Sequence, residues 1–325
     1  MKAIIYRKYG PPDVLHLAEV EKPVPKDGEV LIKVYASTVN RTDCGFLRAD
    51  PWIVRFFNGF AKPKNAILGS EFAGQIEAIG KGATSFGVGD RVFGFSGVTF
   101  GAHAEYIVMH EEAPLTTMPQ TMSYEEAAPS LEGSHYALCD IRAARIQKGQ
   151  RILIYGATGA IGSAAVQLVR HIGAEITAVC GTKNVALVKS LGADKVIDYE
   201  KEDFTNDTDT YDVVFDAVGK SSFGTCRPLL KPRGIYLSTD LGSLAQNPFL
   251  ALATPLFGKK RVLFPLPTLS KKDVVFIKEL MEAGKFRPVI DRRYPLEEIA
   301  NAYRYVETGQ KTGNVVITVA RDVRA

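Results

Sequence analysis

The amino-acid sequence predicts an α/β protein that combines a β-rich part with a doubly wound parallel sheet. Residues before about 120 contain short strand patterns that Gly and Pro interrupt. From about residue 151 onward, strand patterns alternate with helical patterns, and a Gly-rich turn joins the first strand to the first helix. Such alternation is typical of a parallel sheet with covered faces, which binds its ligands at the carboxyl ends of the strands.

The Gly-rich turn lies within residues 152–162, which read ILIYGATGAIG. A turn between a strand and a helix directs backbone N–H groups and a helix N-terminus toward a phosphate. We expect Gly159 to let the backbone approach a pyrophosphate, and Gly162 to let the helix pack closely on its strand. Ala157 stands where the commonest fingerprint has its first Gly, so the motif is A-x-G-x-x-G. The motif alone is weak, because Gly-rich turns also simply reverse chains.

The pattern that follows the turn strengthens this interpretation. The later strands are expected over residues 175–180, 195–199, 211–216 and 234–238, and a helix is expected over residues 183–191. A repeated β-α-β pattern around such a turn favours a dinucleotide site.

The end of the second strand bears on which dinucleotide binds. NAD sites usually place Asp or Glu there, about 20 residues past the turn, to hold the ribose 2′-OH. Residues 180–184 read CGTKN and contain no carboxylate, while Lys183 can meet a 2′-phosphate. The sequence therefore predicts NADP(H) rather than NAD(H). Lys183 could also be an ordinary solvated lysine in the first turn of a helix. The absence of an acidic residue is therefore the stronger evidence for NADP(H).

Composition excludes several other classes of protein. The chain has 325 residues, of which 46% are hydrophobic and 23% charged, with a net charge of +4 and no basic block. We therefore expect no nucleic-acid partner. The four cysteines are widely spaced, which argues against a disulfide framework or a cysteine-rich zinc lobe. Without a signal-peptide pattern or a membrane-spanning run, we expect a cytoplasmic protein with no membrane partner.

The domain organisation follows from the change of pattern along the chain. The β-rich part has strand patterns over residues 29–35, 69–79, 90–95 and 104–109, and a helical stretch over 123–144 follows it. After residue 260, helices are expected over 271–283 and 296–307 and a strand over 314–319. We expect residues 1–121 and 261–325 to form one domain, into which the nucleotide domain of residues 122–260 is inserted.

Several motifs in order resemble the medium-chain dehydrogenase/reductase superfamily, and most closely its zinc-free quinone oxidoreductase and enone reductase branch. The motifs are LGSEFAG at 68–74, GDRV at 89–92, the Gly-rich turn, LGAD at 191–194, DAVG at 216–219 and GNVV at 313–316. The resemblance implies a GroES-like catalytic domain, a Rossmann domain, and a cleft between them for nicotinamide and substrate.

The resemblance also predicts a site without metal. Alcohol dehydrogenase members of the superfamily bind catalytic zinc through a Cys in a Cys-His-Thr-Asp segment and a His in a Gly-His-Glu segment. Asn40 and Ser70 stand at these positions here, and both are poor zinc ligands. Without a Lewis acid, saturated alcohols and unactivated ketones are difficult substrates, whereas conjugated carbonyls accept hydride more readily. We therefore expect NADPH to reduce a small electrophilic quinone or α,β-unsaturated carbonyl.

Candidate residues have three roles: the resemblance supplies the catalytic and cofactor-binding candidates, and aromatic, apolar character supplies the substrate-pocket candidates. Asn40 is the catalytic candidate, either as a hydrogen-bonding amide at the substrate carbonyl or nicotinamide ribose, or merely as a residue that shapes its loop. The cofactor-binding candidates are Thr158, Gly159, Ala160, Ile161, Gly181, Thr182, Lys183, Tyr199, Val218, Gly219, Ser238, Leu241 and Asn314. The substrate-pocket candidates are Trp52, Phe56, Phe95 and Phe100, which are also compatible with ordinary packing.

Two expectations concern alternatives and assembly. No residue stands out as the general acid, so solvent is a possible proton source, and a non-catalytic NADPH-binding sensor or partner-binding protein is the alternative function. Relatives often dimerise by joining strands of their nucleotide domains, and residues 261–264 could be such an edge. We therefore expect a homodimer.

Overall fold

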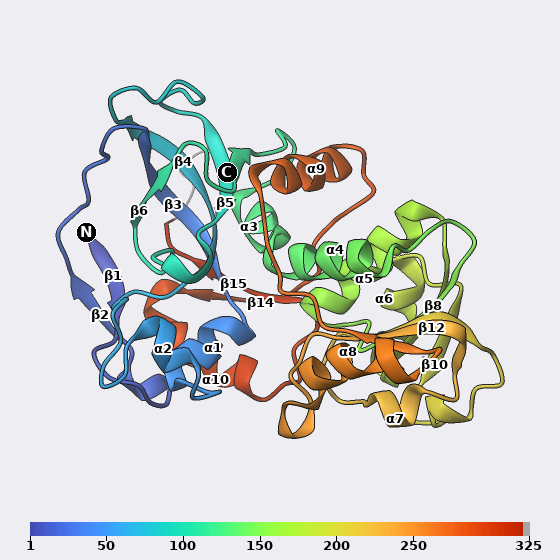
Figure 1. Ribbon diagram of the computed structural model, residues 1–325. Coiled ribbons are helices and arrows are strands. Elements are labelled where there is room, and N and C mark those ends of the chain that lie inside the picture. The colour runs from blue at the N-terminus through green and yellow to red at the C-terminus, as the bar shows by residue number, and fades with distance from the viewer. Residues whose placement is uncertain (321–325) are drawn as a thin grey trace. The chain divides into compact units, whose positions relative to one another are not determined.

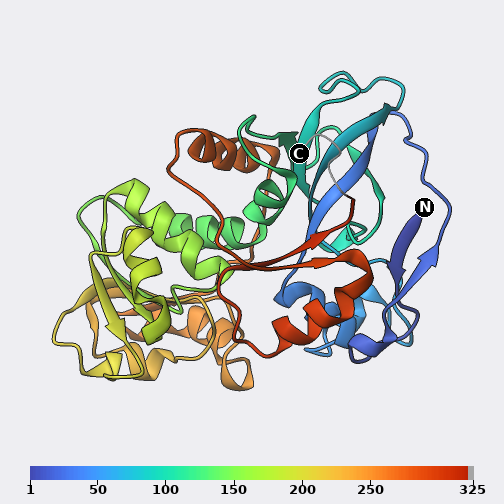
Figure 2. The same cartoon turned by 180° about the vertical axis from the view of Figure 1, so that it is seen from behind.

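The structure is a computed structural model that describes residues 1–320, apart from the side chains of Val98 and Phe257. The chain forms two compact units (Figures 1 and 2). The first unit contains residues 1–132 and the described residues from 269 on, and the second contains residues 133–268. Both divisions fall later than the expected limits after residues 121 and 260. The first shift arises because α3 (Tyr124–Ala127) packs on strands of the first unit, and the second because β13 (Arg261–Leu263) belongs to the sheet of the second.

The second unit is built on a six-stranded, all-parallel sheet with the order β10-β9-β8-β11-β12-β13. Its strands are β8 (Arg151–Tyr155), β9 (Glu175–Cys180), β10 (Lys195–Asp198), β11 (Tyr211–Asp216), β12 (Leu230–Ser238) and β13. β8, the first of these strands in the sequence, lies inside the sheet. The next two strands lie on one side of β8, and the last three lie on the other side. This order is that of the doubly wound fold, which confirms the predicted Rossmann architecture.

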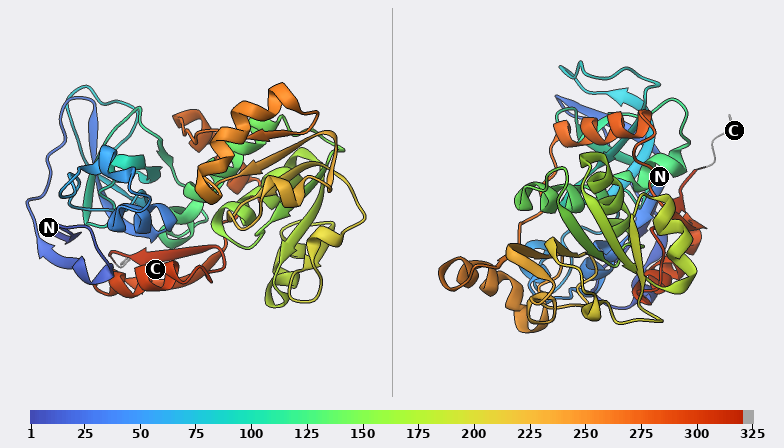
Figure 3. Two further views of the ribbon diagram at one scale, coloured as in Figure 1. Left: turned by 60° about the horizontal axis from the view of Figure 1, so that its bottom comes forward. Right: turned by 90° about the vertical axis from the view of Figure 1, so that its right-hand side faces the viewer.

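Helices cover both faces of this sheet. They are α4 (Glu132–Ala144), α5 (Ala160–Ile172), α6 (Val185–Ser190), α7 (Phe223–Cys226) and α8 (Gln246–Phe257). α5 and α6 connect the strands on one side of β8, whereas α7 and α8 connect the strands on the other side. Because β-α-β crossovers are right-handed, these two pairs of helices lie on opposite faces of the sheet (Figure 3). An ideal Cβ on Gly162 would lie 2.1 Å from the carbonyl oxygen of Gly156, so only glycine permits this close helix–strand packing.

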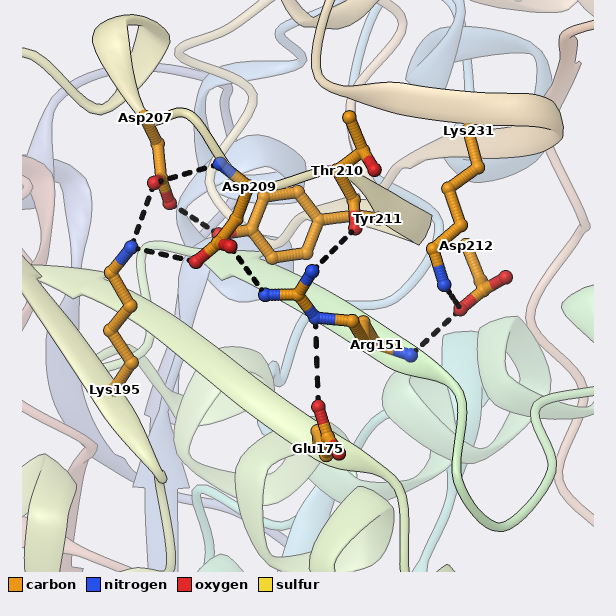
Figure 4. A network of polar contacts seen from close by, with 9 residues as sticks. All are labelled: Arg151, Glu175, Lys195, Asp207, Asp209, Thr210, Tyr211, Asp212 and Lys231. Atoms are coloured by element: carbon orange, nitrogen blue, oxygen red, sulfur yellow. Dashed lines mark hydrogen bonds and ion pairs between the residues drawn. The ribbon is translucent and has the colours of Figure 1, made fainter.

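A network of charges fixes the amino edge of the parallel sheet (Figure 4). Arg151, which opens β8, binds Asp209 at 2.7 Å, and Lys195, which opens β10, binds Asp207 and Asp209 at 2.7 and 3.0 Å. Arg151 also reaches Glu175 at 3.5 Å. These ion pairs are partly exposed, so each contributes modestly on its own. The opposite, carboxyl edge is where ligands of such sheets bind.

The first unit is β-rich, in agreement with the predicted GroES-like domain. Its main sheet has the order β14-β15-β3-β4-β5-β7, and β6 pairs with β3. The strands are β3 (Glu29–Val39), β4 (Glu71–Ile79), β5 (Arg91–Phe95), β6 (Tyr106–His110), β7 (Leu115–Thr117), β14 (Ile290–Pro295) and β15 (Asn314–Thr318). A separate hairpin contains β1 (Lys2–Ile5) and β2 (His16–Glu19).

Five α-helices accompany these strands in the described residues of the first unit. They are α1 (Arg41–Arg48), α2 (Val54–Asn58), α3, α9 (Lys271–Glu282) and α10 (Ile299–Glu307). The helical stretch expected over 123–144 is interrupted at Pro129, where a 3₁₀ turn separates α3 from α4. The capping box of Ser123 and Glu126 is present at the start of α3. None of the helices in residues 1–320 has the length and apolarity needed to cross a membrane.

Candidate functional site

The Gly-rich turn of the second unit offers a place for a pyrophosphate. Gly156 has a positive φ of 79°, which reverses the chain after β8, and the first turn of α5 has no side-chain cap among the described residues. An ideal Cβ on Gly159 would have one neighbour within 4 Å, the Gly156 carbonyl oxygen at 3.8 Å. A helix N-terminus behind such an open glycine binds phosphate through its unpaired N–H groups. Thr158 to Ile161 are partly exposed there, and they fit the predicted cofactor.

The end of β9 carries the residues expected at a 2′-phosphate, but it also has acidic neighbours. Lys183 and Tyr199 are exposed, and Lys183 has no partner within the described chain. Thr182 donates its hydroxyl hydrogen to Asp198 at 2.7 Å. Glu200 lies so close that one of its carboxylate oxygens is 2.5 Å from an ideal Cβ on Gly181. Asp198 ends the adjacent β10 and Glu200 lies in the turn that follows it, so the end of β9 alone does not reveal these carboxylates. The pairing of β9 with β10 is the signal that reveals them.

Two further turns continue the carboxyl edge. Asp216 ends β11 and holds the following turn, since it accepts hydrogen bonds from the N–H groups of Val218 at 3.1 Å and Gly219 at 2.8 Å. Ser238 ends β12 and is buried, whereas Leu241 is exposed beyond it. The structure therefore brings most cofactor candidates to one edge of one sheet.

Asn314 is the one cofactor candidate that belongs to the first unit. It lies in the first unit, where it is buried, and its side-chain amide donates to the carbonyl oxygen of Val289 at 3.0 Å. This contact gives Asn314 a structural role, because the amide joins the start of β15 to the segment before β14.

The first unit contains a buried polar cluster around the two positions that hold zinc in alcohol dehydrogenases. Asn40 caps α1: its Oδ1 accepts from the Asp43 N–H at 3.2 Å, and Asp43 accepts in return from the Asn40 N–H at 3.0 Å. The Asn40 amide also donates to the Ser70 hydroxyl at 3.3 Å. This geometry matches the loop-shaping alternative for Asn40, and its contact with a substrate stays a prediction.

Two buried glutamates complete this cluster, and Glu132 is a member that the sequence analysis did not identify. Glu132 accepts hydrogen bonds from the hydroxyls of Thr42 at 2.5 Å and Ser70 at 3.4 Å. Glu71 accepts from Thr38 at 2.8 Å and from the N–H groups of Leu131 and Glu132 at 2.7 and 2.6 Å. The cluster therefore joins α1, β4 and the start of α4.

Burial dominates the ionisation of the cluster. It raises the pKa of Glu132 to about 7, while the two hydroxyls and Lys311 oppose the shift. Burial also raises the pKa of Asp43 well above its usual range. Lys311 is the nearby cation: burial lowers its pKa to about 8, while the charges of Glu71 and Glu132 partly restore it. Its Nζ donates to the carbonyl oxygen of Gly313 at 2.5 Å.

A neighbouring histidine is neutral and structural. His103 is fully buried and its Nε2 pairs with the carbonyl oxygen of Thr38 at 2.8 Å. Burial lowers its pKa to about 4. Within residues 1–320, no group of three or more His, Cys, Asp or Glu side chains has an arrangement that could hold a metal ion.

The aromatic substrate candidates divide into exposed and buried residues. Trp52 and Phe56 are 64% and 53% exposed, and their rings lie 5.1 Å apart on the segment that contains α2. Phe95 is partly exposed. Phe100 is only 3% exposed and packs edge-to-face on Phe46 with ring centroids 4.7 Å apart, so it is a core residue rather than a pocket residue.

Comparisons with known proteins place this architecture in a family. Residues 26–120 match the alcohol dehydrogenase GroES-like domain, and residues 191–317 match the zinc-binding dehydrogenase family. The 2-methylene-furan-3-one reductase of Solanum lycopersicum is 32% identical, over 98% of this chain and 79% of its own. The NADPH-dependent alkenal/one oxidoreductase of Arabidopsis thaliana is 30% identical over the same shares. The solved quinone oxidoreductase from Coxiella burnetii superposes with a TM-score of 0.88 at 26% identity, covering 98% of this chain and 99% of its own.

The fold and these matches define a pyridine-nucleotide-dependent oxidoreductase. The chain belongs to the medium-chain dehydrogenase/reductase superfamily, in the branch of the quinone oxidoreductases and enone reductases. Asn40 and Ser70 agree with the zinc-free character of that branch.

Proposed function

We propose that this protein is an NADPH-dependent reductase of quinones or other small α,β-unsaturated carbonyls that works without zinc. The observation that carries the proposal is the uncapped start of α5 behind the open Gly159, at the carboxyl edge of the parallel sheet. The relatives named for alkenal, furanone and quinone reduction support the substrate class.

The preference for NADPH rests on Lys183 and Tyr199. Both are exposed beside the end of β9, where the 2′-substituent of an adenosine ribose lies in this fold. Glu200 opposes the preference, because a nearby carboxylate repels a phosphate and can accept from a ribose hydroxyl. Asp198 is already balanced by its ion pair with Lys201 at 3.0 Å, so Lys183 and Glu200 are the two opposing charges that remain beside the end of β9.

The chemistry needs a hydride and a proton. Bound NADPH supplies the hydride to the conjugated carbonyl. The buried Glu132 supplies the proton through Thr42, whose hydroxyl is partly exposed and bonded to this carboxyl. Asn40 and Ser70 hold the other side of Glu132 in place. A positioned acid of this kind typically contributes about 10²–10⁴-fold to rate.

The first test is oxidation of NADPH by the purified protein in the presence of a small quinone or a 2-alkenal, with NADH in parallel. Turnover with NADPH and either acceptor supports the proposal. Tight binding of NADPH without turnover of either acceptor would instead favour the sensor alternative. Preferential turnover with NADH would overturn the cofactor assignment and leave the reductase class standing.

The functional form is a homodimer joined through the second unit. β13 is the last strand of the parallel sheet and pairs only with β12 among the described strands. On the adjoining α8, Phe249, Leu252 and Leu256 are 70%, 78% and 76% exposed and share one helix face. An open strand edge beside an exposed apolar face fits a second copy of the same surface, as in a twofold interface.

A further inference from the structure

A small cavity lies at the carboxyl ends of β12 and β13, wholly within the second unit. Its volume is about 50 Å³. It is lined by Tyr136, Cys139, Asp140, Ser238, Thr239 and the segment 264–267. A water molecule needs roughly 10–15 Å³ of such space, so the cavity accommodates a polar group of a few heavy atoms but not a whole cofactor.

Asp140 is the unusual member of this lining. It projects from α4 and is only 4% exposed, and its carboxyl has no hydrogen-bond or ion-pair partner within residues 1–320. Desolvation alone raises the pKa of its carboxyl to about 7. A buried carboxyl without a partner destabilises a fold, and buried polar groups normally find one. The cavity in front of Asp140 is therefore the natural place for an external hydrogen-bond donor.

The order of the strands indicates which part of a dinucleotide approaches this cavity. The predicted adenosine position is at the end of β9, and the predicted pyrophosphate position is between β8 and α5. Along the same edge, the strands that follow β8 are β11, β12 and β13. An extended dinucleotide that starts over β9 and crosses at β8 thus places its nicotinamide half over β12 and β13.

We propose that Asp140 binds the carboxamide of the nicotinamide ring, with its carboxyl oxygen accepting a hydrogen bond from the carboxamide NH₂. The proposal rests on the proposed function, because it requires a nicotinamide cofactor on this sheet. Thr239 lines the same cavity, and its hydroxyl can donate to the carboxamide oxygen. Such a pair of contacts holds the ring in one rotational orientation about its glycosidic bond, and so presents one face for hydride transfer.

The other groups of the dinucleotide fit this cavity less well. A phosphate would be repelled by Asp140, and the adenine amine would lie beyond β8, on the β9 side of the sheet. The nicotinamide ribose carries hydroxyl donors in the same half, so the experiment must separate ribose from carboxamide. An analogue altered only at the carboxamide makes this separation.

The experiment compares binding of NADPH with binding of its reduced 3-acetylpyridine analogue, in which a methyl group replaces the NH₂. Dissociation constants are measured by fluorescence for the wild type, Asp140→Leu and Asp140→Asn. The wild type is expected to prefer NADPH by about tenfold or more, as for loss of a hydrogen bond to a charged group. In Asp140→Leu the preference is expected to fall to about one, through weaker binding of NADPH. Asp140→Asn keeps an acceptor oxygen in place and is expected to give an intermediate preference.

The control is Asp209→Asn, which alters the charge network at the opposite edge of the sheet and should leave the preference unchanged. An undiminished preference in both Asp140 variants would overturn the assignment, and would point to a ribose contact or to a purely structural role. Circular dichroism verifies that each variant is folded, and the isosteric Asp140→Asn decides the matter if Asp140→Leu does not fold. Wild-type protein that binds neither NADPH nor NADH would overturn the proposed function itself, which is a different result.

Discussion

The Thr42 hydroxyl donates a hydrogen bond to Glu132 across 2.5 Å, although the two residues are 90 positions apart in the chain. Thr42 is partly exposed, whereas Glu132 is buried. A hydroxyl can donate and accept, so it can relay a proton between a buried carboxyl and a group at the surface of the unit. Burial raises the pKa of Glu132 to about 7, and a carboxyl with that pKa can act as an acid near neutral pH.

The first prediction concerns this pair. Replacement Glu132→Gln removes the titrating proton, and kcat for an enone should fall by about 10²-fold. In the wild type, kcat should decrease as the pH rises through about 7, because the protonated form of Glu132 is the active one. This descending limb of the pH–rate profile should be absent in Glu132→Gln. Thr42→Val should lower kcat without moving the KM for NADPH, because it breaks the relay and leaves Glu132 in place.

Steady-state kinetics between pH 5.5 and 9 test this prediction. The groups that face Glu132 are Asp43, Glu71 and Lys311, and Glu71→Gln serves as the control for a change of charge within the cluster. The limb should shift in Glu71→Gln but persist. A limb that survives unchanged in Glu132→Gln would show that the proton comes from elsewhere.

The second prediction concerns Lys183. Lys183→Ala should weaken binding of NADPH by roughly 10–100-fold, because one charge-assisted contact with the 2′-phosphate is lost. Binding of NADH should change by less than about threefold, since NADH lacks that phosphate. Dissociation constants for both cofactors, measured by fluorescence on the same preparations, give the comparison. Equal losses for the two cofactors would contradict the assignment.

The third prediction concerns Glu200, which the structure places beside Gly181. Glu200→Gln removes a negative charge near the expected 2′-phosphate, so the ratio of NADH to NADPH dissociation constants should rise by several-fold. Lys183→Ala and Glu200→Gln thus move the same ratio in opposite directions. Asp194→Asn, which affects an exposed ion pair with Arg170 elsewhere in the unit, is a suitable control. A fall in the ratio for Glu200→Gln would indicate that Glu200 does not face the phosphate.

Local pattern predicted the parallel sheet well, because its buried strands are short apolar runs with clear ends. β9 and β11 have the bounds that the sequence predicted, Glu175–Cys180 and Tyr211–Asp216. The motifs also brought Asn40 and Ser70 together correctly, since their side chains are 3.3 Å apart. These successes concern residues that lie either in a repeated strand–helix pattern or in motifs whose positions the family resemblance relates to one another.

The sequence could not identify contacts between residues that come from different elements far apart in the chain. Glu132 joins Thr42 and Ser70 only because α4 begins beside α1 and β4, and no motif contains all three residues. The capping role of Asn40 was legible in part, because Asn40 and Asp43 have the spacing of a capping box. For Phe100 the sequence left pocket lining and core packing as alternatives, and only its packing on Phe46 in three dimensions favours the core.

The fourth prediction concerns the stability cost of Asp140. Its folded-state pKa is raised from 3.8 to about 7, so the folded state prefers the protonated form. The stabilisation linked to this proton is present at low pH and is lost as the pH rises from about 4 to about 7, by up to about 4 kcal/mol. Asp140→Asn removes this linkage. The free energy of unfolding of the variant, relative to the wild type, should therefore increase between pH 4.5 and pH 8.

Urea unfolding of the cofactor-free proteins at the two pH values measures this difference. Other titrating groups, including Glu132 and His103, contribute equally to both proteins and cancel. A relative stability that does not change with pH would mean that Asp140 titrates normally, and hence that it is better solvated than its burial indicates.

The last prediction concerns assembly through α8. Leu252→Glu places a charge in the centre of the apolar face formed with Phe249 and Leu256, and burying that charge against a second copy is costly. The variant should be a monomer in light scattering at concentrations where the wild type is a dimer. Because Leu252 is 78% exposed within one chain, the substitution should change the stability of the folded monomer little, as measured by the midpoint of unfolding. Val24→Glu, at an 80% exposed position in the first unit, is the matched control and should remain a dimer. A monomeric wild type, or a Leu252→Glu variant that still dimerises, would exclude this face as the interface.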